Sequence, residues 1–307
     1  MSGTEEPVRP DYFSAHSRDL NKHVITAKPH HPAGRVIVRN SFAISTGGST
    51  RRSFVQTLSG SVLTAAVSFP VTDVAFGAEQ PEIPRIKAVA FDAFGIFDPR
   101  PISARAEELF PGKGAELVKV WRDRQFEYSW LRTLTRRYVD FWQVTSEALT
   151  YAGKLLNLEM PSETRERLMA GFLELKPWPD APTVLAELNR LKLRLCLLSN
   201  FTPHMLRTNI EQSGLEKAFE FLLSTDAAKA YKPDPHAYQL AANAFGLPNH
   251  EIGFVAFAGW DAAGARSFGF PTFWVNRLNL PLEQLGITAD TESHTLTELP
   301  GFLNFGK

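Results

Sequence analysis

The chain has 307 residues, enough for about two domains, and its 33 basic and 33 acidic residues balance to a net charge of zero. It contains no long basic run, which excludes the electrostatic footprint of a nucleic-acid-binding protein. A single cysteine, Cys196, excludes an internal disulfide and a cysteine-rich metal site. This composition favours a neutral enzyme that acts on a small molecule.

Residues 1–84 precede the predicted folded domain, and we expect them to be disordered or removed. The first 49 residues are rich in Pro, Gly, Ser, His and Arg and show no sustained periodicity. Between about residues 49 and 78, Arg51, Arg52 and Phe54 precede a mildly apolar stretch, in the order of a twin-arginine export signal. The alternative is an irregular buried helix after a chance Arg-Arg pair.

This signal predicts a periplasmic protein, and the protein would be cytoplasmic if the signal did not function. The apolar stretch from Leu58 to Phe76 contains a Pro and an Asp, which make it too polar for a membrane span. We therefore expect no stable membrane span after processing.

The stretch Ile86–Asp98 has the pattern of a first strand and its exit loop. Ala88–Phe91 is short and apolar, and Gly95 follows it, as is typical of a buried parallel strand. Asp92 comes directly after this strand, where open α/β sheets bind their ligands. Asp92 is therefore a candidate nucleophile, and the alternative is a loop aspartate that caps the next helix.

Four helical segments are predicted from Ile102 to about Leu175, where apolar residues recur at helical spacing. The segments are ARAEELF, AELVKVWRDRQFEYSWLRTL, DFWQVTSEALTYAGKLL and SETRERLMAGFLEL. Because they interrupt the sheet after its first strand, we expect residues 100–178 to form a helical cap domain. Residues 85–99 and 179–307 would form the core domain beneath it.

From Asp180 onward, the sequence alternates between helices and strands. The predicted helices are 181–191, 203–213, 235–245 and 261–268, and the predicted strands are LRLCLLSN, FEFLLST, EIGFVAFA and PTFWVN. Repeated units of this kind predict an α/β fold with a doubly wound, parallel, Rossmann-like sheet. The remainder, from Leu280 to Lys307, predicts a closing turn and a short helix.

Polar residues follow four of the predicted strands. Asp92 follows the first, Ser199 and Asn200 end the second, and Lys232 and Asp261 follow the third and fourth. Because the carboxyl ends of parallel strands meet at one edge, we expect these side chains to converge in an active site. Simpler explanations exist, since Lys232 could be a turn residue and the others could cap helices.

The order of these residues resembles the haloacid dehalogenase superfamily over roughly residues 86–276, and within it the type II (S)-2-haloacid dehalogenases. Four motifs in the expected order carry the resemblance, namely WRDRQFEYSWLRTL, LSN, YKPDPHAY and GWDAAGARSFGFPTFWVNR. The resemblance implies a cofactor-independent enzyme with a helical cap over a Rossmann-like core. It also implies a possible homodimer built on the cap helices.

The implied reaction is hydrolytic dehalogenation of short 2-haloalkanoic acids to 2-hydroxy acids. By the resemblance, Asp92 attacks C2 and expels halide with inversion, and water then hydrolyses the aspartyl ester. Lys232 keeps Asp92 ionised, and Asp261 orients or activates the water. Tyr238 matches a family tyrosine that supports the lysine region.

The resemblance also implies the residues that bind substrate and halide. Arg122 would meet the departing halide or the substrate carboxylate, with Asn200 donating alongside. Ser199 and the backbone N–H groups of Ala93 and Phe94 would hold the carboxylate. The alternative for Arg122 is a solvated arginine on an amphipathic helix. The aromatic residues around it are assigned to packing of the cap or to the pocket lining (Phe126, Tyr128, Trp130 and Trp142).

Phe94 distinguishes the chain from the phosphatases of the superfamily, which place a second aspartate at this position. A phenyl ring can neither protonate a leaving group nor bind a hydrated cation, whereas halide departure needs no proton. We therefore expect no metal. Two alternatives stay open: another hydrolase of the superfamily that acts on a phosphate or another small acid, and a binding protein for small carboxylates or halides.

Two loops depart from the family pattern. Gly95-Ile96-Phe97 lacks the usual threonine and is one residue shorter, and Ala256-Phe257-Ala258 replaces a loop that usually offers Ser and Asn. Those polar groups help to position the hydrolytic water. The consequence is an altered halide or acid preference, slow ester hydrolysis, or lost turnover, and we expect the first because the charged residues are retained.

Overall fold

The computed structural model describes residues 86–303, and all of them belong to one compact unit. The predicted export signal lies outside the described residues. Within residues 86–303, no helix combines the length and the apolar character needed to cross a bilayer.

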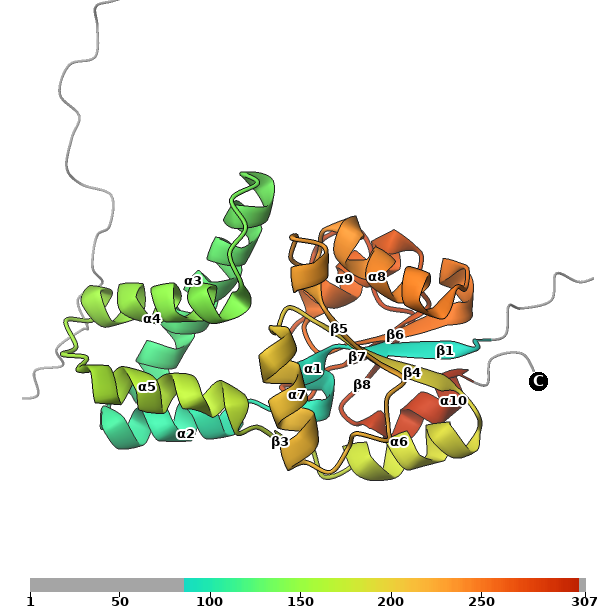
Figure 1. The fold of residues 1–307 in the computed structure, drawn as a ribbon, viewed down its shortest axis with the longest axis horizontal. Helices are drawn as coiled ribbons and strands as arrows, with labels where there is room; N and C mark the ends of the chain where they lie inside the picture. Colours follow the sequence, from blue (N-terminus) through green and yellow to red (C-terminus); the bar gives the residue numbers. More distant parts are fainter. Residues whose placement is uncertain (1–85, 304–307) are drawn as a thin grey trace, which may run out of the picture. The chain divides into compact units, whose positions relative to one another are not determined.

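A six-stranded parallel sheet forms the centre of the core (Figure 1). The strands lie in the order β5-β4-β1-β6-β7-β8. Their bounds are β1 Ala88–Phe91, β4 Arg194–Ser199, β5 Phe221–Ser224, β6 Ile252–Ala256, β7 Thr272–Val275 and β8 Thr291–Ser293. Strand β1 is central and fully buried, which explains its apolar run. The predicted α/β fold class with a parallel sheet is confirmed.

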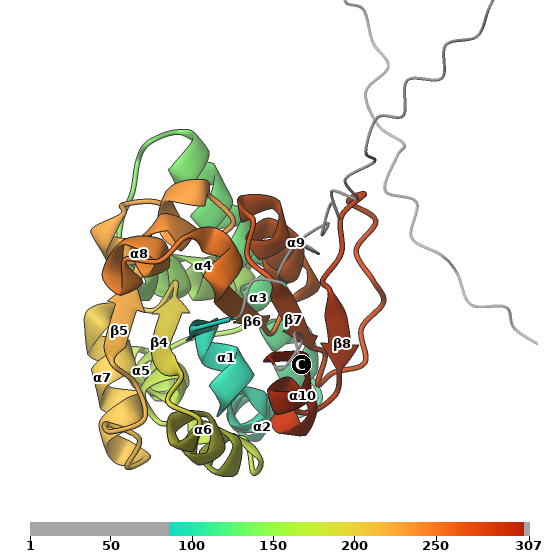
Figure 2. The ribbon, with the colours of Figure 1, turned by 90° about the vertical axis from the view of Figure 1, so that its right-hand side faces the viewer.

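Helices cover both faces of the sheet, as Figure 2 shows. One face carries α6, α7 and α10, and the other carries α8 and α9 (Ala181–Arg190, Pro203–Gln212, Leu299–Leu303, Pro235–Phe245 and Gly259–Phe268). Alternate strand residues supply two separate cores. Val89 and Phe91 pack in the first core, whereas Ala88, Ala90 and Cys196 pack in the second. Period-two alternation of this kind is what a two-sided sheet requires.

The four predicted cap helices are present as α2 (Arg100–Leu109), α3 (Gly114–Leu134), α4 (Phe141–Leu155) and α5 (Ser162–Ala170). Figure 1 shows them to one side of the sheet. An antiparallel ribbon connects them to the core through β2 (Phe97–Asp98) and β3 (Lys176–Pro177). The predicted domain boundaries at residues 99 and 179 lie beside this ribbon and stay predictions.

Strand β8 was not predicted, because the segment from Leu280 to Lys307 favoured only a turn and a short helix. Its sequence is TES, and only Ser293 is buried. A short polar strand at the edge of a sheet has no hydrophobic pattern that would reveal it. It pairs with β7 and extends the sheet beyond the expected edge.

The only cysteine of the chain lies on β4. Cys196 has no exposed surface and forms no disulfide. Burial raises the pKa of its thiol far above the ordinary value, so the thiol stays protonated and unreactive.

Candidate active site

Asp92 leaves the end of β1 and begins a one-turn helix, α1 (Ala93–Ile96). Its backbone N–H donates to the carbonyl of Val255 at 2.9 Å, and its carboxylate accepts a hydrogen bond from the Phe94 N–H at 3.1 Å. Asp92 therefore does cap the next helix, as the simpler explanation held. The same carboxylate also lines a small cavity, so capping and a chemical role coexist.

Lys232 is the centre of the charged cluster. Its Nζ lies 2.7 Å from Oδ1 of Asp92 and 2.6 Å from Oδ2 of Asp261, and its side chain is 1% exposed. Burial alone would lower the pKa of Lys232, but the two carboxylates outweigh this effect and raise it. Lys232 therefore stays charged, and it holds the two carboxylates close together.

Asp261 lies in the first turn of α9, which begins two residues earlier than predicted. The N-cap of that helix is Ala258, so the alternative that Asp261 caps it is wrong. Burial, reinforced by Asp92 and opposed by Lys232, raises the pKa of Asp261 to about 6. A carboxylate with such a pKa accepts a proton at near-neutral pH, as a general base must.

Tyr238 supports Asp261 from behind. Its hydroxyl donates to Oδ1 of Asp261 at 2.7 Å, and its ring is fully buried in the second core. Tyr238 does not line the cavity, so its prediction as a substrate-binding residue is corrected. It contacts the carboxylate of Asp261 instead of a ligand.

Ser199 and Asn200 end β4 at the same edge. The Ser199 hydroxyl accepts a hydrogen bond from the Phe201 N–H at 3.2 Å. Oδ1 of Asn200 accepts from the Lys232 N–H at 3.1 Å and from the Thr225 hydroxyl at 3.3 Å. Both residues line the cavity, and the amide N–H₂ of Asn200 stays available to donate.

The simpler explanation, that Ser199 or Asn200 caps the following helix, does not hold. Thr202 is the N-cap of α7, and its hydroxyl accepts from the Met205 N–H at 3.2 Å. The side chains of Ser199 and Asn200 lie at the edge of the cavity instead.

Arg122 reaches the cavity from α3 of the cap. Its guanidinium lies 5.2 Å from the ring centre of Phe94 and 5.4 Å from that of Phe126. Within residues 86–303 it forms no hydrogen bond or ion pair, whereas Arg124 on the same helix pairs with Glu127. Burial lowers the pKa of Arg122, and Asp92 opposes this shift. Arg122 is thus half-buried at the edge of the cavity and forms no ion pair among residues 86–303, and its role as an anion-binding residue stays a prediction.

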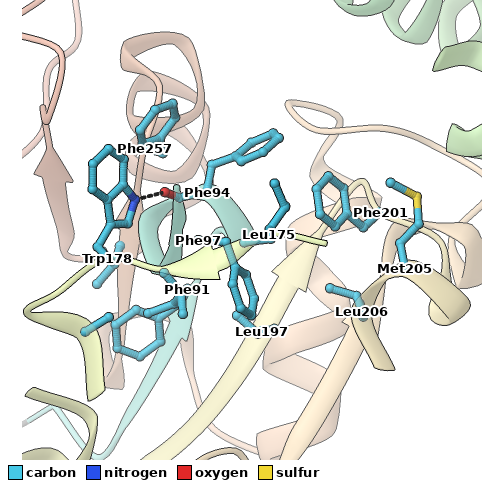
Figure 3. Packing of buried hydrophobic residues seen from close by; sticks show 14 of the residues in the cluster. Phe91, Phe94, Phe97, Leu175, Trp178, Leu197, Phe201, Met205, Leu206 and Phe257 are labelled. Atoms are coloured by element: carbon cyan, nitrogen blue, oxygen red, sulfur yellow. Dashed lines mark hydrogen bonds between the residues drawn. The ribbon is translucent and has the colours of Figure 1, made fainter. Parts of the chain in front are cut away.

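Aromatic side chains form the rest of the wall. Phe94 packs edge-on against Phe201, with ring centres 5.1 Å apart, and lies 5.8 Å from Phe257 (Figure 3). Phe141 and Trp260 also line the cavity. Phe141, Phe201 and Trp260 were not predicted as site residues from the sequence. Only their position in the sequence could have indicated them, because Phe201 and Trp260 lie next to the polar residues Asn200 and Asp261.

The cavity is small, about 20 Å³, which is room for about one water molecule. A groove of about 600 Å³ between the cap and the core adjoins it. The two share Arg122, Phe126, Phe257, Ala258 and Trp260 as lining. A small anion could therefore enter from the groove once these side chains shift.

Phe94 lines the cavity where the phosphatases have their second aspartate, so the donor set lacks one metal ligand. Among residues 86–303, no group of three or more His, Cys, Asp or Glu side chains could hold a metal ion. Together the described groups bring a carboxyl group at the end of β1, an arginine without an ion pair among residues 86–303 and a buried carboxyl group to one cavity.

The profile of the haloacid dehalogenase-like hydrolases matches residues 86–269. The chain belongs to this family. The (S)-2-haloacid dehalogenase of Pseudomonas sp. (strain YL) is 43% identical over 69% of this chain and 91% of its own length. Haloacetate dehalogenase H-2 of Moraxella sp. (strain B) is 38% identical over 67% of this chain and 92% of its own.

A solved structure extends the comparison to three dimensions. The L-2-haloacid dehalogenase of Xanthobacter autotrophicus with chloropropionic acid covalently bound is 34% identical, with a TM-score of 0.67. The match covers 72% of this haloacid dehalogenase-like hydrolase and all of that chain. The resemblance predicted from the four motifs is therefore confirmed.

Proposed function

We propose that this haloacid dehalogenase-like hydrolase converts short 2-haloalkanoic acids, in particular (S)-2-haloacids, to 2-hydroxy acids. The observation that carries the proposal is that two features line one cavity. Asp92 is bonded to the buried Lys232, and Arg122 forms no ion pair among residues 86–303. The relative with chloropropionic acid covalently bound supports a covalent intermediate.

In the first step, a carboxylate oxygen of Asp92 attacks C2 of the substrate. A C–O bond forms with inversion, and the C–halogen bond breaks with both electrons leaving on the halide. No proton is transferred in this step, so the cavity needs no acid at the position where Phe94 lies. Arg122 and the amide of Asn200 receive the halide, because an always-charged guanidinium in a dry pocket stabilises an anion strongly.

The substrate carboxylate is held at the exit of β4 and the turn after β1. The Ser199 hydroxyl and the Ala93 N–H donate to it. The Phe94 N–H was also predicted to do so, but in the free protein it donates to Asp92 itself at 3.1 Å. It would become available to the substrate once esterification removes the charge of Asp92.

In the second step, water attacks the ester carbonyl while Asp261 accepts a proton from it. The ester C–O bond breaks, the leaving alkoxide takes one proton of the water and departs as the hydroxy acid, the other proton is released to solvent, and the Asp92 carboxylate is restored. Ala256 and Ala258 offer no hydroxyl or amide to this water. The second step therefore depends on Asp261 and its partners Lys232 and Tyr238.

The test uses purified protein that begins near Glu79, with (S)-2-chloropropionate and no added metal. Chloride release and intact protein mass are followed together. Steady chloride release that Asp92→Asn abolishes supports the proposal. One chloride per chain with a lasting mass adduct would mean that displacement works and hydrolysis does not. This is the second candidate function, and Ala256 and Ala258 favour it because they offer no polar group to the water.

If neither chloride release nor a mass adduct appears, the substrate assignment is overturned. Activity on a phosphate ester that requires magnesium would then support another hydrolase of the family. Binding of a small carboxylate without chloride release would support a binding protein.

We also propose a homodimer built on the cap helices, by resemblance to the family. Leu131 on α3 and Leu155 at the end of α4 are each 53% exposed, and a dimer interface on the cap would cover such apolar side chains. Analytical ultracentrifugation would test this, with Leu131→Asp as the disrupting variant and Lys119→Asp on the same helix as the control. A monomer in the unmodified protein would contradict it.

We further propose export by the twin-arginine pathway, on the strength of Arg51, Arg52 and Phe54. The test fuses residues 1–85 to a reporter that is active only in the periplasm. Replacement of both arginines by lysine should abolish the signal while charge is conserved. Equal reporter activity in both fusions would contradict the twin-arginine route, and no activity in either fusion would favour a cytoplasmic protein.

A further inference from the structure

The one-turn helix α1 has carbonyl groups that it cannot satisfy by itself. A helix of four residues is too short for its own N–H groups to reach these acceptors. Only the carbonyl of Ala93 is bonded from the next residue of the chain, by the Phe97 N–H. The remaining carbonyls, of Phe94, Gly95 and Ile96, need donors from elsewhere.

Trp178 supplies two of these donors. Its indole Nε1–H donates to the carbonyl of Phe94 at 3.0 Å, as Figure 3 shows, and its backbone N–H donates to the carbonyl of Ile96 at 2.8 Å. Trp178 lies directly after β3, where the chain returns from the cap to the core. It is 5% exposed, so these bonds are shielded from competing water.

Arg277 supplies the third donor. Its Nη2 donates to the carbonyl of Gly95 at 3.2 Å and to Oδ1 of Asp180 at 2.9 Å, while Nη1 donates to Oδ2 of Asp180 at 3.1 Å. The side chain of Arg277 is 6% exposed. A two-point ion pair with the partly buried carboxylate of Asp180 fixes the plane of the guanidinium and so fixes the donor to the turn.

Both connections to the cap meet at the same indole. The guanidinium of Arg277 lies 4.6 Å from the ring centre of Trp178, and that of Arg100, at the start of α2, lies 4.7 Å from it. The indole that bonds the turn carrying Asp92 therefore lies at the return from the cap, between Arg277 of the core and Arg100 at the start of the cap.

We propose that Trp178 and Arg277 are positioning residues that hold the α1 turn, and through it Asp92, in the orientation for attack. Neither touches the cavity that holds the reacting groups. They act on the backbone that orients the Asp92 carboxylate and the Phe94 N–H. The catalytic part of this inference rests on the proposed dehalogenation.

The first test is Trp178→Phe, which removes the indole N–H and keeps an aromatic ring and the backbone donor. Hydrogen exchange of the amides in residues 92–98 should become faster than in the wild-type protein. Chloride formation in a single turnover, with enzyme in excess of (S)-2-chloropropionate, should slow by about tenfold or more, because a small misplacement of a reacting group costs one to two orders of magnitude. KM should change less than about twofold.

Trp121→Phe is the matched control. Trp121 is also buried, and its Nε1–H also donates to a backbone carbonyl, that of Thr145 at 2.8 Å, but within the cap. Both variants should lose similar thermal stability, and only Trp178→Phe should speed exchange in residues 92–98. Arg277→Lys, which keeps the charge opposite Asp180 but loses the planar fork, should change exchange and rate in the same direction.

Unchanged exchange in residues 92–98, or unchanged single-turnover rate despite faster exchange, would overturn the inference. If the wild-type protein released no chloride at all, the proposed function would fail. The exchange comparison between Trp178→Phe and Trp121→Phe would then decide by itself whether Trp178 holds the turn.

Discussion

Two buried or partly buried cations face the same cavity, and their surroundings differ. Lys232, from the core, has a carboxylate oxygen at 2.7 Å and another at 2.6 Å. Arg122, from the cap, has only the rings of Phe94 and Phe126 beside it and no anionic partner within residues 86–303. The charge of the lysine is paired inside the protein, whereas the charge of the arginine, under the proposed function, meets the halide.

The difference indicates a division of work between the core and the cap. The charges of Asp92, Asp261, Lys232 and Arg122 sum to zero, so the free site needs no counter-ion. When Asp92 becomes an ester and a halide is released, the new anion replaces the lost carboxylate charge beside Arg122. In the proposed reaction the net charge of these groups and the substrate, −1 because of the substrate carboxylate, is the same before and after the first step, so no additional charge is buried.

The largest expected effect is on the core side. Asp92→Asn removes the nucleophile while leaving Lys232 bonded to Asp261, so the protein should fold. Steady chloride release from (S)-2-chloropropionate should fall by on the order of 10⁴-fold or more, as for loss of other catalytic nucleophiles. Near-normal release from a folded variant, checked by its thermal midpoint, would show that another group attacks the substrate.

On the cap side, Arg122→Lys should reduce single-turnover chloride release by on the order of 10²-fold. The ammonium keeps the charge but loses the planar array of donors that meets the halide. Arg124→Lys is the control, because Arg124 lies on the same helix but stacks on Tyr151 at 4.1 Å. Equal losses in both variants would remove the contrast between the two arginines.

The third effect concerns proton transfer. Burial raises the pKa of Asp261 to about 6 while Asp92 is charged; in the ester that charge is gone, so the rate of ester hydrolysis should rise with pH through a midpoint somewhat below 6 as this carboxyl ionises. Tyr238→Phe removes a hydrogen bond that lowers this pKa, so the midpoint should move to higher pH. A hydrogen bond to a charged group contributes about 1.5–3 kcal/mol, so hydrolysis near pH 6 should slow by about tenfold. Decay of the mass adduct measures this rate.

The contribution of Asp261 to the free energy of unfolding changes with pH in the opposite direction to that of an ordinary ion-paired carboxylate. Folded Asp261 binds its proton more tightly than the unfolded chain, whose value is the ordinary 3.8. Its contribution to the free energy of unfolding should therefore decrease as pH rises from about 4 through about 6. Asp261→Asn should remove this slope in a comparison of thermal midpoints, and an unchanged slope would place the titration elsewhere.

The smallest effect tests the altered loop before α9. Ala258→Asn adds an amide to the cavity wall near Asp261. If the hydrolytic water lacks a partner, one added hydrogen bond of about 1 kcal/mol should speed adduct decay by about fivefold. Ala258→Leu, of similar size without polar atoms, should not. A slower decay in both would show that the space matters and the hydrogen bond does not.

The fold was largely predictable because its strands are apolar and its helices periodic. The run Ala88–Phe91 predicted the central strand, helical periodicity predicted the cap helices, and alternation predicted strands β4 to β7, whereas α1 and the β2–β3 ribbon were not predicted. Strand β8 was missed because two of its three residues face solvent and none is apolar. Its position depends on pairing with β7, which is a long-range contact that no local pattern records.

The site was predictable where the geometry of the sheet determines it. Parallel strands place Asp92, Lys232 and Asp261 at one edge whatever the details of packing. The aromatic wall was not predictable, because Phe201 and Phe257 are apolar residues like those of any core. The hydroxyl bond of Tyr238 was equally hidden, since spacing on α8 indicates a buried face but not which carboxylate lies opposite.

The burial of Cys196 has a practical consequence. A thiol that is closed to solvent and held protonated on β4 resists air oxidation and adventitious cross-linking, so the sequence suits an oxidising compartment without a disulfide. Because it is the only thiol in the chain, a sulfhydryl reagent can label the molecule only when the sheet opens. The rate of such labelling would report the opening of the second core directly, without an engineered probe.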